Sequence, residues 1–379
     1  MRQKSIVTVL LTLFVVAAHA SGTPTAVNRV QGTYRSEAAG FRLTQLVTDL
    51  EHPWAIAFLP DGRTLITERP GRLWSYDGRT VTRIDGLPQI TASGQGGLLD
   101  LIPDPDFERN SLIYFSYSSR FSGGLGTTVA RARLSGSRLV DVQEIWRQNR
   151  ASAGGRHFGS RLAFDGSGML LITIGDRGQQ DRSQDPNDHA GTLVRIAPDG
   201  SVPADNPFVR SDDGAADVWS YGHRNAQGIA INPDSGEIWL HEHGPQGGDE
   251  LNIARAGDNH GWPVITHGVN YGTGTRIGVG TSAPGMEEPL IHWTPSIAPS
   301  GMAFYTGDLM SGWRGDIFIG ALAGQHLRRV VIDGDRVVHQ EVLLDRAIGR
   351  IRDVRQGPDG HLYLITDDRR GSLYRIDPQ

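Results

Sequence analysis

The stretch WAIAFLPDGRTLITE, at residues 54–68, sets two apolar runs on either side of a Pro-Asp-Gly turn. Apolar runs of strand length around such a turn predict a β-hairpin, because proline and glycine supply the backbone angles that reverse the chain. Five more stretches repeat the phrase with a similar turn, spaced by roughly fifty to seventy residues. They occupy residues 98–118, 161–176, 228–242, 301–321 and 354–368.

Six copies of one hairpin predict an all-β fold, a six-bladed β-propeller with two further strands in each blade. A β-sandwich pair is the competing architecture, and the likeness of the six hairpins favours the propeller. The two chain ends should close the ring within one blade, with GSLYRIDP at residues 371–378 and a strand near Phe41 as candidates. We therefore expect a single propeller domain over residues 41–379. Residues 21–40 are small and polar, and we expect a loosely ordered lead-in there.

The N-terminus has the parts of a secretory signal. Arg2 and Lys4 are basic, residues 6–18 are apolar but short for a membrane span, and an Ala-His-Ala cleavage pattern ends at Ala20. We expect a signal peptide over residues 1–20, with an uncleaved anchor as the alternative. The mature protein is then expected to be secreted, in the periplasm. No second apolar run follows, so no integral membrane segment is expected after cleavage.

Charge and cysteine content exclude several classes of partner and site. The formal net charge is -5 and no basic run occurs, which argues against a nucleic-acid partner. The chain has no cysteine, so disulfides and thiolate metal ligands are excluded. Its single lysine, Lys4, lies in the expected signal, which leaves arginine and histidine as the cationic side chains of the mature protein.

Four glycine-rich stretches carry polar side chains and are not blade turns. They are SGQGGLL with Gln95, GGRHFGSRLAF with His157, YGHRNAQGIA with Arg224 and Asn225, and HEHGPQGGDELN at residues 241–252. Three of them run directly into the first strand of a repeat. Because they then occupy equivalent corners of successive blades, we expect them to converge in space.

His157 and Asp176 suggest an acid–base pair. An imidazole is a good general base near neutral pH, and His157 precedes a hairpin that ends at Asp176, whose carboxylate could orient it. The alternative for His157 is an ordinary surface histidine.

Two arginine motifs suggest an anion or quinone site. Arg224 next to Asn225 offers a guanidinium fork and an amide to a carboxylate or quinone oxygen; a salt bridge between blades is the alternative. Arg350 and Arg352 are two residues apart and share one face of a strand, as an anion clamp or as an edge charge pair.

The stretch HEHGPQGGDELN is a candidate metal site. The carbonyls of Gly244 and Pro245 could hold calcium, which takes oxygen ligands in flexible numbers. His241 and His243 share a face and leave zinc open, although zinc would need a further converging ligand. We favour calcium.

Together these stretches resemble the soluble PQQ-dependent aldose sugar dehydrogenases, relatives of soluble quinoprotein glucose dehydrogenase. The resemblance covers nearly the whole mature chain. The specific motifs, in order, are RHFGSRL, GHRNAQG, EHGPQGGDE and RIRDV. The resemblance implies a six-bladed propeller that oxidises an aldose with PQQ and calcium and passes electrons to an acceptor that the sequence does not identify.

The resemblance also implies roles for single residues. His157 is similar to the base that takes the sugar C1 hydroxyl proton while hydride passes to PQQ, with Asp176 as its partner. Gly244 and Pro245 would give carbonyls to the PQQ-bound calcium, and Glu250 resembles a ligand of a second calcium. The remaining matches are to residues around the cofactor: Gln95, Arg224, Asn225, Arg350 and Arg352.

The chain departs from the family pattern at two positions. A lysine often stands near the cofactor where this chain has Ala323 in GALAGQ. His260, in DNHGWP, stands where a tyrosine is common, and a main-chain carbonyl there could still bind the second calcium. Two other functions remain open: a calcium-dependent lactonase of the gluconolactonase type, and a non-catalytic binding propeller.

Overall fold

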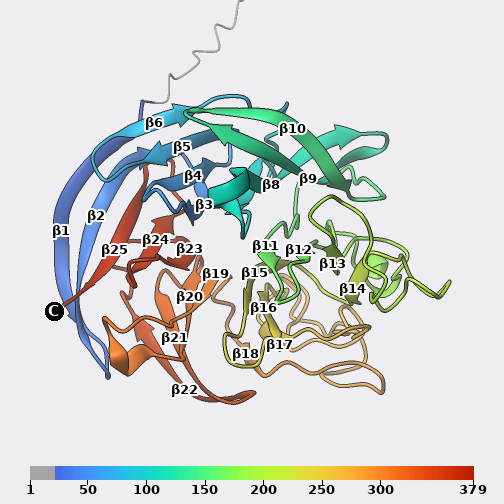
Figure 1. The fold of residues 1–379 in the computed structure, drawn as a ribbon. Coiled ribbons are helices and arrows are strands. Elements are labelled where there is room, and N and C mark those ends of the chain that lie inside the picture. Colours follow the sequence, from blue (N-terminus) through green and yellow to red (C-terminus); the bar gives the residue numbers. More distant parts are fainter. Residues whose placement is uncertain (1–21) are drawn as a thin grey trace, which may run out of the picture.

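The structure is a computed structural model that describes residues 22–379. Residues 22–379 form six antiparallel sheets arranged in a ring (Figure 1). Five sheets have four strands and the sixth has five. The innermost strands contact one another in order around the ring, and the last contacts the first. The predicted six-bladed propeller is confirmed. The expected signal peptide lies outside the described residues.

Each blade runs from an innermost strand near the ring axis to an outermost strand at the rim. In that order, the first three blades are β3 (Pro53–Phe58), β4 (Thr64–Glu68), β5 (Arg72–Tyr76) and β6 (Val81–Ile84); β7 (Leu98–Pro103), β8 (Leu112–Phe121), β9 (Gly124–Ser135) and β10 (Arg138–Arg147); and β11 (Leu162–Phe164), β12 (Leu170–Thr173), β13 (Thr192–Ile196) and β14 (Val218–Tyr221). The other three are β15 (Ala226–Ile231), β16 (Ile238–Glu242), β17 (Asp249–Ile253) and β18 (Ile291–Trp293); β19 (Pro299–Phe304), β20 (Ile317–Ala321), β21 (Leu327–Asp333) and β22 (Arg336–Leu343); and β23 (Ile351–Gln356), β24 (Leu362–Thr366), β25 (Gly371–Pro378), β2 (Gly40–Leu50) and β1 (Thr25–Arg35). Short helical turns are α1 (Phe107–Asn110), η1 (Gln180–Gln184) and η2 (Ser311–Trp313).

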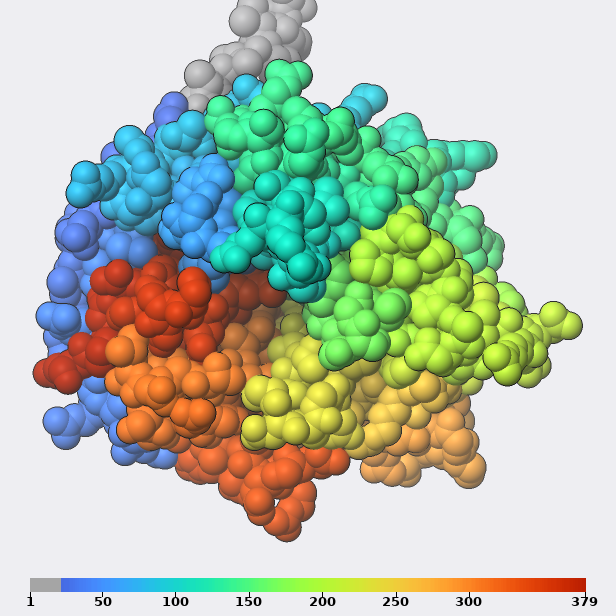
Figure 2. All heavy atoms as spheres, in the orientation of Figure 1, coloured from blue at the N-terminus to red at the C-terminus, as the bar shows by residue number. Residues whose placement is uncertain are grey.

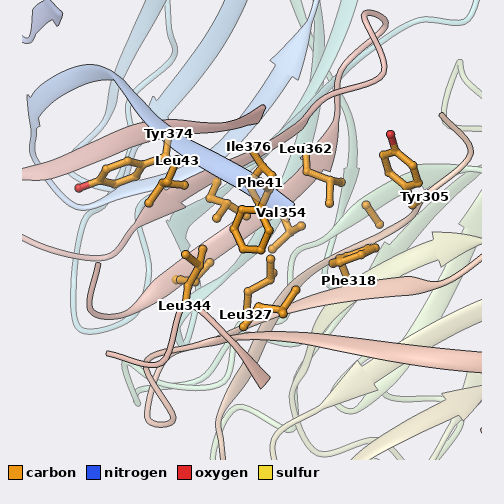
Figure 3. Close-up of a cluster of buried hydrophobic side chains, with 14 of the residues drawn as sticks. Phe41, Leu43, Tyr305, Phe318, Leu327, Leu344, Val354, Leu362, Tyr374 and Ile376 are labelled. Carbon is orange, nitrogen blue, oxygen red and sulfur yellow. The ribbon is translucent and has the colours of Figure 1, made fainter. Parts of the chain in front are cut away.

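The two chain ends close the ring in the sixth blade. Strand β2 pairs antiparallel with β25, with Phe41 opposite Pro378 and Leu43 opposite Ile376. This is the closure that the sequence predicted. Phe41, Leu43 and Ile376 then pack with Leu327 from the preceding blade in a buried cluster (Figure 3).

The expected loose lead-in at residues 21–40 is wrong for most of its length. Residues 25–35 form β1, which pairs with β2 as a fifth, outer strand of the closing blade. Most of its side chains are exposed or half-buried, so the segment lacks the apolar alternation that marks a strand. Backbone hydrogen bonding along β2, which needs no apolar side chain, forms the strand.

Each innermost strand has two unlike ends. We call the side where these strands begin the loop face, because long connections enter there, and the side where they end the turn face. On the turn face, Asp61, Asp165 and Asp359 each accept a backbone N–H from the residue two positions on. In the fourth hairpin the turn acceptor is Asn232, which accepts a hydrogen bond from the backbone N–H of Asp234.

Buried ion pairs join the innermost strands across the ring between the two faces. Arg161 Nη1 lies 2.8 Å from Asp353, while Arg355 binds both Asp353 at 3.1 Å and Asp100 at 2.9 Å. Asp100, Asp353 and Arg161 are essentially inaccessible to solvent. Two guanidinium groups thus meet two carboxylates, which balances their charge inside the protein. Over residues 22–379, no helix is both long and apolar enough to cross a membrane.

Candidate active site

Two adjoining cavities open among the loops of the loop face. The larger is about 750 Å³ and is lined by His157, Arg224 and the Gly244–Gly247 turn, among others. The smaller is about 310 Å³ and is lined by Asn225, Arg350 and Arg352, among others. Three residues line both cavities: Gln95, His243 and Ala298. The loop stretches that the sequence singled out therefore do converge.

A hollow of about 1010 Å³ lies on the opposite, turn face. Figure 2 looks onto this side, and the hollow lies between blue, teal and red segments near the ring centre. Its lining comes from residues 56–60, 102–109 and 355–358, which are rich in proline and apolar side chains. It contains no histidine, and Arg355, which it shares with the buried ion pairs, separates it from the loop-face cavities. Size alone does not make it the site of chemistry.

His157 and Asp176 form a close pair at the edge of the larger cavity. His157 Nδ1 lies 2.6 Å from Asp176 Oδ1. The backbone N–H of Gly178 donates to that same oxygen at 2.6 Å, and Trp262 Nε1 donates to the other at 2.9 Å. The carboxylate is therefore held from three directions. With Nδ1 engaged, Nε2 is the ring nitrogen that remains for a ligand.

The environment keeps this imidazole neutral. Burial lowers the pKa of His157 below its ordinary value of 6.5, and Asp176 offsets only part of that effect. For Asp176, burial alone would raise the pKa, but the hydrogen bonds from His157 and Gly178 and the charge of Arg224 lower it overall. A neutral imidazole beside an ionised carboxylate is the state that a general base requires.

The backbone around His157 is held in an uncommon shape. His157 has a φ of 53°, in the left-handed region. Its N–H donates to Gln95 Oε1 at 2.7 Å, which ties it to the second blade. At Gly175 a Cβ would stand 2.2 Å from the carbonyl oxygen of His157, so only glycine fits beside the loop.

Arg177 hydrogen-bonds to the loop that carries His157, a role that was not predicted from the sequence. Its guanidinium donates to the carbonyls of Gly154, at 3.0 Å, and Arg156, and its Cζ lies 3.4 Å from the ring centre of Phe158. Arg177 is 1% exposed. Consecutive residues of one turn thus hold the imidazole (Asp176) and its backbone (Arg177). The sequence gives no sign of this role, because it depends on contacts with a loop more than twenty residues away.

Arg224 and Asn225 stand between His157 and the calcium candidate loop. Arg224 Nη1 donates to the carbonyls of His243, at 3.0 Å, and Gly244, at 2.6 Å. Within residues 22–379, Arg224 makes no salt bridge to a carboxylate, so the alternative of an inter-blade ion pair is not what is seen. Asn225 Oδ1 accepts from Gly159 N–H at 3.3 Å, next to the His157 loop.

Arg350 directly precedes β23 and Arg352 lies within it, and the two side chains point to the same side, as their spacing predicted. Their guanidinium groups reach the same oxygen of Asp367, at 3.4 and 3.0 Å. Both line the smaller cavity. The motif is therefore both an edge charge pair and a candidate anion clamp. The two arginines share a carboxylate and still present positive charge to the cavity.

The Gly244–Pro245 turn is shaped by an acid that was not singled out from the sequence. Asp249 accepts from Gly244 N–H at 2.9 Å, Ser296 Oγ at 2.6 Å and Ile297 N–H at 2.8 Å. In this arrangement the Gly244 carbonyl accepts a hydrogen bond from Arg224. A cation bound to that carbonyl would have to share the oxygen with the guanidinium or displace the guanidinium. The turn itself lines the larger cavity, within reach of a ligand bound there.

Of the two histidines of this stretch, His241 is a packing residue and His243 lines both cavities. His241 is fully buried, with Nε2 3.2 Å from the Gly301 carbonyl, and His243 Nε2 lies 2.8 Å from the Pro299 carbonyl. Burial lowers the pKa of both rings. No group of three or more histidine, aspartate or glutamate side chains in residues 22–379 is arranged to hold a metal ion.

Glu250 lies beside a second carboxylate at a very small cavity. Burial, together with the nearby Glu242, raises the pKa of Glu250 well above its ordinary value. Its carboxylate accepts a long hydrogen bond from Asn252 at 3.4 Å, and it has no cationic partner among the described residues. His260 lines the same cavity and stacks on His223, with ring centres 4.4 Å apart. Glu242 is paired with His223 and accepts from the backbone N–H of Arg224, whereas Glu250 has only its long bond from Asn252. A poorly satisfied carboxylate next to a second one favours a cation.

The cavity rims contain two more residues that were not predicted from the sequence. Tyr271 lies in the long connection between β17 and β18, lines the larger cavity and is 67% exposed. Arg69 directly follows β4 and lines the smaller cavity. An isolated tyrosine in a long loop has no periodic signal, but an arginine at the loop-face end of a blade hairpin could have been singled out.

Comparison with known proteins identifies the family. The profile described as glucose/sorbosone dehydrogenase matches residues 50–375. The chain belongs to this family. It is 44% identical over 339 residues to the aldose sugar dehydrogenase of Escherichia coli (strain K12), covering 87% of this chain and 91% of that protein. The predicted resemblance is confirmed.

Solved structures of glucose/sorbosone dehydrogenase relatives share the fold. A crystal structure of a glucose dehydrogenase is 48% identical, with a TM-score of 0.87, and the match covers 89% of this chain and 99% of that one. The PQQ-bound form of aldose sugar dehydrogenase from Streptomyces coelicolor is 27% identical, with a TM-score of 0.73, over 93% of this chain and 100% of that one. Such relatives indicate that this family member is an oxidoreductase.

Proposed function

We propose that this glucose/sorbosone dehydrogenase family member oxidises aldoses at C1 to the lactone, using PQQ and calcium. The observation that carries the proposal is the His157–Asp176 pair, with a neutral imidazole, at the cavity that also contains Arg224. A general base beside an unpaired guanidinium suits removal of a proton from an alcohol while negative charge develops nearby. The names of the relatives supply the substrate class and cofactor.

The residues present suit a quinone that bears several carboxylates. The two adjoining cavities together contain Arg224, Arg350 and Arg352, and Arg224 makes no carboxylate pair within residues 22–379. For calcium the fit is mixed. The Gly244 carbonyl already accepts from Arg224, whereas Glu250 stands without a cation from the described residues beside Glu242. Gly244 and Pro245 would bind the ion next to the cofactor, and Glu250 with the His260 carbonyl would bind a second one.

Bound PQQ would supply a quinone that accepts a hydride, with calcium polarising its oxygens. His157 Nε2 takes the proton of the sugar C1 hydroxyl as the C1 hydrogen leaves with its electron pair. Asp176 holds the ring through Nδ1 and stabilises the imidazolium that forms. Arg224 and Asn225 would hold the quinone oxygens, and Gln95 fixes the loop that carries the base. The sugar loses two electrons and two hydrogens and becomes the lactone.

Reconstitution tests this proposal. The purified protein, loaded with PQQ and calcium, should reduce an artificial electron-accepting dye when an aldose is added, and omission of PQQ should abolish the reaction. Chelation should lower both cofactor occupancy and the melting temperature, because ligands that bind only the folded state stabilise it. Lactone hydrolysis without dye reduction would instead favour the gluconolactonase-type function. Failure to bind PQQ at all would favour a binding propeller.

We also propose export to the periplasm with cleavage after Ala20. N-terminal sequencing of the exported protein should begin at Ser21, and an intact Met1 on the mature protein would contradict this. The physiological electron acceptor would then be a periplasmic or membrane-bound redox partner.

A further inference from the structure

The smaller loop-face cavity has an excess of positive charge. Three arginines line it, Arg69, Arg350 and Arg352, and the only carboxylate in its lining is Asp367. Asp367 already binds Arg350, Arg352 and, through its other oxygen, His52. Three guanidinium charges against one carboxylate leave about two positive charges around a cavity of about 310 Å³.

Arg69 is the cation of this group that lacks a carboxylate. Its Nη1 donates to the Gly94 carbonyl at 2.6 Å, and its own carbonyl accepts from Leu98 N–H at 3.1 Å. Across residues 22–379 it makes no salt bridge. Arg195, by contrast, has both Asp165 and Asp205 as partners. Arg69 is thus positioned by main-chain contacts, and its charge is not balanced by the described part of the protein.

Arg352 responds to this charge. Burial lowers the pKa of Arg352 most, and the positive charges of Arg350 and Arg69 lower it further. Arg352 Nε is also buried without a hydrogen-bond partner among the described residues. A multiply charged anion in the cavity would relieve the repulsion among the three groups and satisfy the unpaired donor.

The position of the cavity selects the kind of anion. It adjoins the larger cavity through Gln95, His243 and Ala298, so one molecule can extend from His157 into the arginine group. Such a molecule needs a reactive end beside the base and carboxylates at the other end. The smaller cavity has a polar lining with Trp54 and Phe158 as flat apolar surfaces, which suits a planar aromatic acid.

We propose that Arg69 is a third arginine that binds a carboxylate of PQQ, together with Arg350 and Arg352. This inference rests on the proposed function and adds a residue to its cofactor site. Arg69 then supplies a cation in a mature chain that has no lysine. It acts in cofactor binding and leaves proton removal to His157.

Equilibrium titration with PQQ tests the role of Arg69. The wild type, Arg69→Gln, Arg69→Lys and Arg79→Gln are each titrated at fixed calcium, without sugar or electron acceptor, and binding is followed by PQQ absorbance or fluorescence. Arg79 is an exposed arginine in a turn of the same blade and is the matched control. Thermal melts of the unloaded proteins establish that each variant is folded.

We expect Arg69→Gln to weaken PQQ binding by roughly tenfold or more, since a charge-assisted contact is lost. Arg69→Lys should lose less, because it keeps the charge but not the fork, and Arg79→Gln should match the wild type. The dependence of log Kd on log salt concentration should also be shallower for Arg69→Gln. Wild-type binding with an unchanged Kd and salt slope in both Arg69 variants would overturn this inference alone. Absence of wild-type binding would overturn the proposed function as well.

Discussion

The loop face and the turn face are built from opposite ends of the same six innermost strands, yet their polar side chains serve different purposes. On the turn face short hairpins constrain the chain, and aspartate side chains such as Asp61 and Asp359 serve the turns. On the loop face longer connections enter, and they carry His157, Arg224 and Gln95 to one place. The contrast teaches that a chain-reversing turn leaves its residues little freedom for chemistry, whereas an entering connection can be varied without breaking a blade.

The largest expected effect comes from removing the base on the loop face. His157→Gln should lower turnover of the PQQ-loaded protein by about two to four orders of magnitude, the usual contribution of a general base. PQQ binding should persist. Steady-state kinetics and PQQ titration measure the two quantities. His361→Gln, on the turn face, is the control and should keep full turnover; turnover near wild type in His157→Gln would mean that another group removes the proton.

Activity should depend on pH through the protonation of the same imidazole, that of His157. The pKa of His157 lies below 6.5, so the base is neutral at pH 7 and is lost as pH falls through the pKa of the folded protein. The kcat/KM should therefore be level above that pKa and fall about tenfold per pH unit below it. Since Asp176 raises the pKa of the ring, the loss of activity at acidic pH should occur at a lower pH in Asp176→Asn. If the activity of Asp176→Asn fell at the same pH as that of the wild type, protonation of His157 would be excluded as the cause.

Arg177 should matter for turnover more than for binding. Arg177→Met keeps much of the packing on Phe158 but removes the hydrogen bonds to the loop carbonyls, which should misplace His157. We expect kcat to fall roughly tenfold to a hundredfold while the Kd for PQQ is unchanged. Arg177→Lys should restore part of the loss. Equal losses in kcat and in PQQ affinity would point to general unfolding of the site.

The smallest effect is expected on the turn face. Asp359→Ala removes acceptors for His361 N–H and the Tyr363 hydroxyl, and should cost about 1 kcal/mol of unfolding free energy. Turnover should stay at the wild-type level, because the buried ion pairs separate this face from the cavities. Urea unfolding and steady-state rates provide the comparison. A large loss of turnover in a folded Asp359→Ala protein would show that the faces are coupled.

The sequence predicted the ring well because each blade repeats a local pattern. The six hairpins and the β2–β25 closure follow from apolar runs and turn residues, whereas β1 was missed because its pairing depends on backbone hydrogen bonds. At the site, repeat register placed His157 near Asp176. It could not show that Asp249 organises the calcium candidate loop, because those contacts join segments far apart in sequence and the blade pattern does not encode them.

The closing blade also sets an order on the assembly of the protein. Strand β2 precedes the other five blades in the chain and its partner β25 follows them, so the edge of β2 stays unpaired until all five have been synthesised. An exposed strand edge is a site for pairing with other chains. Strand β25 therefore completes the ring: a chain cut short before Gly371 would keep two open edges, on β2 and β24, and would be prone to aggregation and degradation.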